Sequence, residues 1–261
     1  MKNGICVIAA AGLLGLGAAP SFADTLNATY TGVDKNASRV VGVQIQGQPS
    51  LNGSYYAGSM NHTIHSTDSP ALGGLTGKSV GLFCIEFEQN AQKSSNVYNV
   101  QTIDDAPDNP NDSTNYGVIK SDKVHAVIAA ALELGWMQRG KMLVKTGNKG
   151  LDRDRGAAIQ LLIWESLFED DNAGWDLLDG EFIANVQNKA GIKNRVTDLL
   201  NSIDENQFLG ERVSGLYALT SDQTQDQLVV VPLPPAALAG LAGLAIIGGV
   251  QYRRRREQRK A

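Results

Sequence analysis

The residues of this sequence that could form a covalent bond are a cysteine and a glutamine. Of the two cysteines, Cys6 lies in an apolar N-terminal run that we expect to be removed, which leaves Cys84 as a single thiol. A thiolate is the strongest ordinary side-chain nucleophile. A leftover cysteine in an exported protein indicates a reactive or intermolecularly paired thiol, whereas the ordinary alternative is a small buried hydrophobic residue.

Gln160 stands where a polar side chain is unexpected. Apolar residues recur at helical spacing at Ala157, Leu161 and Trp164, and Gln160 falls within this stripe. A buried carboxamide without hydrogen-bond partners costs about 1–3 kcal/mol. Two interpretations follow: either Gln160 bonds to a neighbouring backbone group, or its carboxamide has been converted into something other than an amide.

The segments around these two residues resemble the paired signature of bacterial Cys–Gln thioester domains. In that family an aromatic-Cys-Ile-Asp/Glu strand segment supplies a thiol, and a Thr-Gln-x-Ala-Ile-Trp segment supplies an acyl group. The two side chains condense, with loss of ammonia, into an internal thioester. The matching segments here are F-C-I-E at 83–86 and I-Q-L-L-I-W at 159–164, and the resemblance covers roughly residues 75–232.

Carried over position by position, the resemblance implies that Cys84 is the thioester cysteine, Gln160 the acyl donor and Trp164 the family tryptophan. The chain departs from the family pattern at Ile159, where threonine is usual, and at Leu162, where alanine is usual. The thioester would acylate an incoming amine or hydroxyl, and a lysine side chain is the family's expected nucleophile. We therefore expect single-use covalent attachment (adhesion) rather than an enzyme with turnover.

Condensation needs the two groups at attack distance, donors for the developing oxyanion and shelter from water, to which Trp164 would contribute. Glu86 is a candidate to shuttle the proton, and the alternative is a solvated or hydrogen-bonded carboxylate. No cofactor and no metal are expected, since two cysteines exclude a Cys-rich zinc site and no phosphate-binding or dinucleotide motif occurs.

Other functions are compatible with the same residues. The main alternative is a non-reactive extracellular matrix or structural protein of the same fold, in which Cys84 is simply buried. A thiol hydrolase would pair Cys84 with His125, but His125 lies in an expected helix. His62 and His65 could bind a metal, although a solvated Ser/Thr-rich loop is the simpler interpretation. The acidic loop at 104–112 lacks the glycine and glutamate of an EF-hand.

The N-terminal residues 1–23 are typical of a secretory signal peptide. Lys2 precedes an apolar run from Ile5 to Ala19, and small residues before Asp24 form a plausible cleavage site. These features predict export of the body of the chain.

The C-terminal residues 232–261 resemble the VPLPA variant of PEP-CTERM sorting tails, with one additional proline. That resemblance implies a Gram-negative bacterium, an exosortase-type enzyme as partner, an inner-membrane intermediate and delivery to the cell surface or matrix. The alternative is an ordinary single-pass anchor, with the arginines on the cytoplasmic side. The sorting motif comprises Val231, Pro232, Leu233, Pro234, Pro235 and Ala236, a short apolar helix follows over 236–250, and the stop-transfer cluster comprises Arg253, Arg254, Arg255 and Arg256.

Hydrophobic residues make up 43% of the whole chain, which is enough apolar material for a core. Its Asp and Glu residues outnumber its Lys and Arg residues, which argues against nucleic acid as a partner. Periodicity predicts strands over 39–46, 78–87, 96–103, 213–219 and 227–231, and helices over 121–138 (N-cap Ser121 or Asp122), 155–169 and 181–203.

This order predicts an α+β fold, with sheet or sandwich elements at both ends and a helical segment (about 121–203) inserted between them. We expect residues 24–74 to form a β-rich N-terminal extension and residues 75–231 the thioester-type domain.

Overall fold

The computed structural model describes residues 24–108 and 114–232, so the expected signal peptide and nearly all of the sorting tail lie outside the described residues. Strands precede and follow a helical region, which confirms the predicted α+β class. The strands are β1 (Thr25–Ile45), β2 (Gly53–Thr67), β3 (Ser79–Cys84), β4 (Ser95–Gln101), β5 (Met137–Gln138), β6 (Met142–Leu143), β7 (Phe182–Ala184), β8 (Leu216–Thr220) and β9 (Gln227–Val230). The helices are α1 (Gly117–Glu133), α2 (Lys149–Phe168) and α3 (Ala190–Asn206).

Six strands close into a ring. The order is β2-β3-β9-β8-β4-β1, and β1 also pairs with β2, so that every strand has two antiparallel neighbours. Strand β7 extends the sheet from the far end of β1. Each of the six strands contributes to one buried apolar cluster inside the ring, which includes Leu26, Ile64, Leu82, Tyr98, Leu219 and Val229.

The ring depends on the length of β1. Its first residues, Thr25 to Thr29, pair with β4, and Val43 to Ile45 pair with β7, while β2 runs along most of its other edge. Residues 24–74, expected as a β-rich extension, therefore lie in the same sheet as β3, which carries Cys84.

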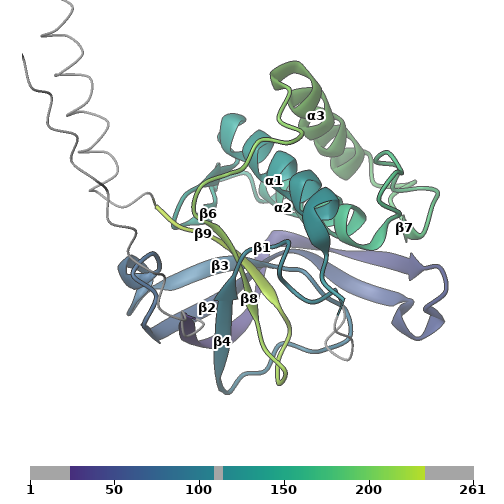
Figure 1. Cartoon of the computed structure of the whole chain (residues 1–261). Helices are drawn as coiled ribbons and strands as arrows, with labels where there is room; N and C mark the ends of the chain where they lie inside the picture. The colour runs from purple at the N-terminus through teal and green to yellow at the C-terminus, as the bar shows by residue number, and fades with distance from the viewer. Residues whose placement is uncertain (1–23, 109–113, 233–261) are drawn as a thin grey trace, which may run out of the picture.

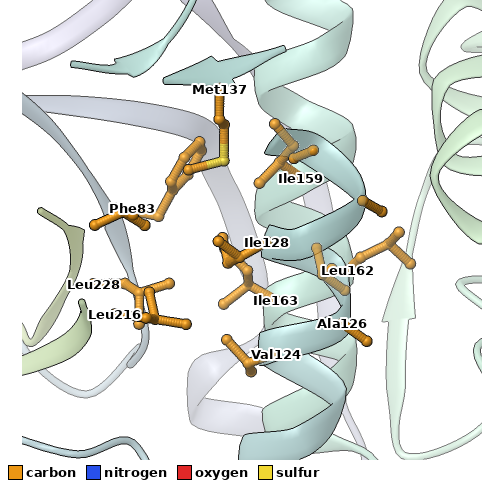
Figure 2. Close-up of a cluster of buried hydrophobic side chains, with 14 of the residues drawn as sticks. Phe83, Val124, Ala126, Ile128, Met137, Ile159, Leu162, Ile163, Leu216 and Leu228 are labelled. Carbon is orange, nitrogen blue, oxygen red and sulfur yellow. The ribbon is translucent and has the colours of Figure 1, made fainter. Parts of the chain in front are cut away.

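The three helices lie on one side of the sheet, with α3 farthest from it (Figure 1). Helix α2 is central, because it packs against β1, β2, α1 and α3. One of its two apolar clusters joins the sheet to α1, and in this cluster Phe83 of β3 faces Ile128 of α1 and Ile163 of α2 (Figure 2). Nearly every residue of α2 from Gly156 onward is buried. This packing fixes the rotation of the helix about its axis and its position along that axis, and so determines where the Gln160 side chain points.

Two helix starts differ from the predicted ones. Helix α1 begins at Gly117 rather than at an N-cap at Ser121 or Asp122, because Tyr116 is anchored before it: its N–H donates to Ala106 O at 3.0 Å. Helix α2 begins at Lys149, and the side chain of Asn148 caps its first turn.

The third helix also differs. Residues 182–184, expected to be helical, form β7 and pair with Val43 to Ile45. The helix then begins at Ala190. Pairing with an available sheet edge outweighs local helical periodicity at this point.

Within the described residues, no helix combines the length and apolar character needed to cross a membrane.

Candidate functional site

Cys84 is the last residue of β3, at the point where the ring meets helix α2. It is buried, and it pairs with Gln227 of β9. Its apolar surroundings come from three elements: Val41 and Val43 of β1, Ala57 and Met60 of β2, and Ala157, Leu161 and Trp164 of α2. The N-terminal strands thus form one wall around the cysteine.

Gln160 holds the main chain of Cys84 at two points. Its Oε1 accepts a hydrogen bond from the Cys84 N–H at 3.1 Å, and its Nε2 donates to the Cys84 carbonyl at 2.7 Å. Both residues are buried, with Gln160 fully inaccessible. The predicted placement of Gln160 in a buried stripe is confirmed, and both its oxygen and its nitrogen have a main-chain partner 76 residues away.

This geometry supplies two requirements of acyl transfer. The carboxamide is fixed against the main chain of the residue that bears the thiol, which reduces the conformational search before attack. The Cys84 N–H already donates to the carbonyl oxygen on which negative charge would develop.

The thiol itself is neutral in this environment. Its Sγ donates to the Glu86 carbonyl at 2.7 Å. Burial raises the pKa of Cys84 well above its ordinary value, and the hydrogen bond to the Glu86 carbonyl offsets only part of this effect. Condensation at this site therefore requires the proton to leave as sulfur attacks.

Trp164 covers the site together with other aromatic side chains. Its ring lies 4.6 Å from that of Phe87, 6.3 Å from Tyr55 and 6.4 Å from Phe182. The Trp164 side chain is buried, and its Nε1 has no hydrogen-bond partner among the described residues. The cluster excludes water from Cys84, as a thioester would need.

Glu86 is buried, with 1% of its surface exposed, so it is not the solvated carboxylate that the sequence allowed. Neither side-chain oxygen has a hydrogen-bond partner among the described residues. Burial, together with the nearby carboxylates of Asp226 and Glu88, raises its pKa to about 9. Glu86 is therefore protonated at neutral pH and can donate a proton.

The two departures from the family pattern point away from Cys84. Ile159 and Leu162 belong to the cluster that α2 forms with Phe83 and with α1 (Figure 2). Cys84 belongs to the other cluster, with Ala157 and Trp164. The bulk of Leu162 therefore does not crowd the cysteine.

The remaining candidates do not join this site. His62 lies inside strand β2 and is buried, so the expectation of a solvated loop is wrong for it; His65, in the same strand, bonds to Thr29 Oγ1 at 2.8 Å. His125 Nδ1 accepts a hydrogen bond from the Val213 N–H at 2.8 Å, which turns it toward the chain before β8. Residues 24–108 and 114–232 contain no group of three or more acidic, Cys or His side chains that could hold a metal.

The first residue of the expected sorting motif lies inside the fold. Val231 is buried in the ring interior and donates from its N–H to Gly215 O at 2.9 Å, and Pro232 is the last described residue. The rest of the motif and the arginine cluster lie outside the described residues, as does part of the acidic loop at 104–112.

Two side chains that were not among the candidates from the sequence donate hydrogen bonds to the segment after Cys84. The Tyr116 hydroxyl donates to Ile85 O at 2.5 Å, and Gln225 Nε2 donates to Glu86 O at 3.2 Å. Both residues are distant from Cys84 along the chain. No protein-family model, curated protein or solved structure significantly matches this chain.

Proposed function

We propose that Cys84 and Gln160 condense into an internal thioester, which then attaches the protein covalently to an amine- or hydroxyl-bearing target outside the cell. The observation that carries this proposal is the pair of hydrogen bonds between the Gln160 carboxamide and the Cys84 main chain. They hold the carboxamide against the main chain of the residue that bears the thiol, in a buried site.

In the condensation, Cys84 Sγ bonds to the side-chain carbonyl carbon of Gln160 and the carbon–nitrogen bond breaks. The thiol proton ends on the departing nitrogen, which leaves as ammonia. An amide is a poor electrophile, so the reaction depends on fixed proximity and on the Cys84 N–H as oxyanion donor. Protonated Glu86, immediately after this strand, is the candidate proton carrier.

In the attachment step, the target's nitrogen or oxygen bonds to the same carbon, and Cys84 is released as a thiol. The bond is used once, so the protein is an adhesin and not an enzyme. The signal peptide and the sorting tail expected from the sequence place the body outside the cytoplasm, with an exosortase-type enzyme as processing partner.

The intact mass of residues 24–231, measured without reductant, tests the proposal. Loss of ammonia predicts a mass about 17 Da below the encoded one. Methylamine should convert this species into one about 14 Da above the encoded mass, with the label on residue 160. Cys84→Ala and Gln160→Glu should each abolish both signals.

The result that contradicts the thioester is the encoded mass, combined with addition of a thiol reagent to Cys84 after denaturation. A bond hydrolysed during purification leaves glutamate at position 160 and a mass about 1 Da above the encoded one. Fragment masses at that residue distinguish hydrolysis from a bond that never formed.

A second candidate function is a non-reactive matrix or structural protein. It is favoured by the neutral thiol, whose hydrogen bond to the Glu86 carbonyl and whose raised pKa are typical of an inert core cysteine. In that case Gln160 only joins α2 to β3, and the encoded mass is the expected result.

A further inference from the structure

The three residues Cys84 to Glu86 are held by side chains from three distant parts of the chain. Each carbonyl oxygen in this segment accepts a hydrogen bond from a different side chain. The donors are Gln160 Nε2 of α2 to Cys84 O at 2.7 Å, the Tyr116 hydroxyl, just before α1, to Ile85 O at 2.5 Å, and Gln225 Nε2, just before β9, to Glu86 O at 3.2 Å.

Condensation removes two of the hydrogen bonds that fix this segment. Departure of ammonia takes away the Nε2 that donates to Cys84 O. Loss of the thiol proton takes away the bond from Cys84 Sγ to Glu86 O. The donors from Tyr116 and Gln225 are chemically unchanged, as is the bond from the Ile85 N–H to Asp226 O at 3.1 Å.

The Glu86 carbonyl is the critical acceptor, because it is shared. It accepts hydrogen bonds from both the reacting thiol and the Gln225 amide. When sulfur turns toward the Gln160 carbon, Gln225 is the one donor within residues 24–108 and 114–232 that still bonds to this carbonyl. Glu86 and Ile85 are buried, so water cannot replace a missing donor cheaply.

We propose that Tyr116 and Gln225 are positioning residues for the condensation of Cys84 with Gln160. They hold Ile85 and Glu86 in place while the reacting pair gives up its own hydrogen bonds. This inference rests on the thioester proposed above, and it assigns a role to two residues outside the Cys84 and Gln160 segments.

The test follows the appearance of the 17 Da deficit with time, in full chain synthesised in a cell-free system with detergent. Tyr116→Phe removes only the hydroxyl, and Gln225→Met keeps the length of the side chain without its donor. Gln101→Met is the matched control, since Gln101 Nε2 donates to Thr220 Oγ1 elsewhere in the ring. The thermal midpoint of each variant shows that it is folded at the temperature used.

We expect condensation about tenfold slower in Tyr116→Phe and in Gln225→Met, and unchanged in the control. Gln225→Glu adds a readout that a merely structural role would not move. Its carboxyl can donate to the Glu86 carbonyl only when protonated, so its rate relative to wild type at the same pH should recover as pH falls.

The proposal is overturned if wild type condenses and both donor-lacking variants, folded by the same criterion, condense within about twofold of its rate. A wild-type chain that never shows the deficit overturns the thioester itself. The wild-type mass alone gives that outcome, so failure of the thioester is distinguishable from failure of the positioning role.

Discussion

The carboxamide of Gln160 spans the main chain of Cys84, accepting from its N–H at 3.1 Å and donating to its carbonyl at 2.7 Å. The β2–β3 pairing ends at Leu82, and at Cys84 a side chain of α2 binds the main chain of β3 in addition to the pairing with β9. The contact joins the helical layer to the ring whether or not a covalent bond follows, and its energetic role can be measured apart from the chemistry.

Replacing Gln160 by glutamate in a Cys84→Ala background should destabilise the fold by about 1–3 kcal/mol. The new oxygen would face the Cys84 carbonyl as a second acceptor, and both groups are buried. Urea denaturation measures the difference, with Gln101→Glu in the same background as control. A loss of stability no larger than that of the control would show that the two hydrogen bonds between Gln160 and the main chain of residue 84 do not stabilise the fold.

Replacing Glu86 by glutamine should flatten the dependence of stability on pH. The pKa of Glu86 is raised from 4.5 to about 9, so between these values the folded chain keeps a proton that the unfolded chain releases. The stability from this group is full below pH about 4.5 and is lost as pH rises toward about 9. Glutamine mimics the protonated acid throughout, and near pH 9 its thermal midpoint should be higher by about 3 °C or more.

Asp226→Asn is the matched comparison for that experiment. Burial raises the pKa of Asp226 to about 7. The gain in stability from Asp226→Asn should therefore reach its full size near neutral pH, whereas the gain from Glu86→Gln should keep growing to higher pH. Parallel melting curves for wild type and Glu86→Gln across this range would refute the assignment of Glu86 as a buried neutral acid.

Trp164→Ala should cost about 3–5 kcal/mol, because a fully buried ring in contact with Phe87 and Cys84's apolar wall leaves a cavity. Trp175→Ala is the control, since Trp175 is only partly buried and packs at the edge of the other cluster. Chemical denaturation compares the two variants. Equal losses of stability in the two variants would mean that Trp164 contributes no more to the core than the partly buried Trp175.

Gly156→Ala should destabilise the fold although alanine favours helices. A Cβ at this position would lie 2.0 Å from Ala37 O, a backbone atom of β1 that cannot move alone. We expect a loss of more than about 2 kcal/mol, with α2 pushed away from the sheet that Gln160 contacts. Gly150→Ala, in the same helix, meets only the Asn148 side chain at 3.3 Å and should stay within about 1 kcal/mol of wild type. A neutral effect of Gly156→Ala would contradict the close approach of α2 to β1.

The sequence predicted the elements whose periodicity is local. The apolar stripe of α2 placed Gln160 on a buried face, and the strand pattern around Cys84 placed it in a sheet, because side-chain spacing in a helix or strand repeats over a few residues. The order of strands and helices was enough for the α+β class. Two boundaries moved where contacts outside the local periodicity decided them, at Tyr116 before α1 and at 182–184 in β7.

Only the tertiary structure decided what surrounds the cysteine. The ring closes because β1 pairs with β2 and β4 at once, which makes residues 24–74 a wall of the site. The donors Tyr116 and Gln225 reach the segment after Cys84 from other elements. Hydrogen bonds between residues far apart in the chain leave no periodicity in the sequence. Residue types and local spacing could therefore identify Cys84 and Gln160 as candidates, but only the tertiary structure showed that they are in contact.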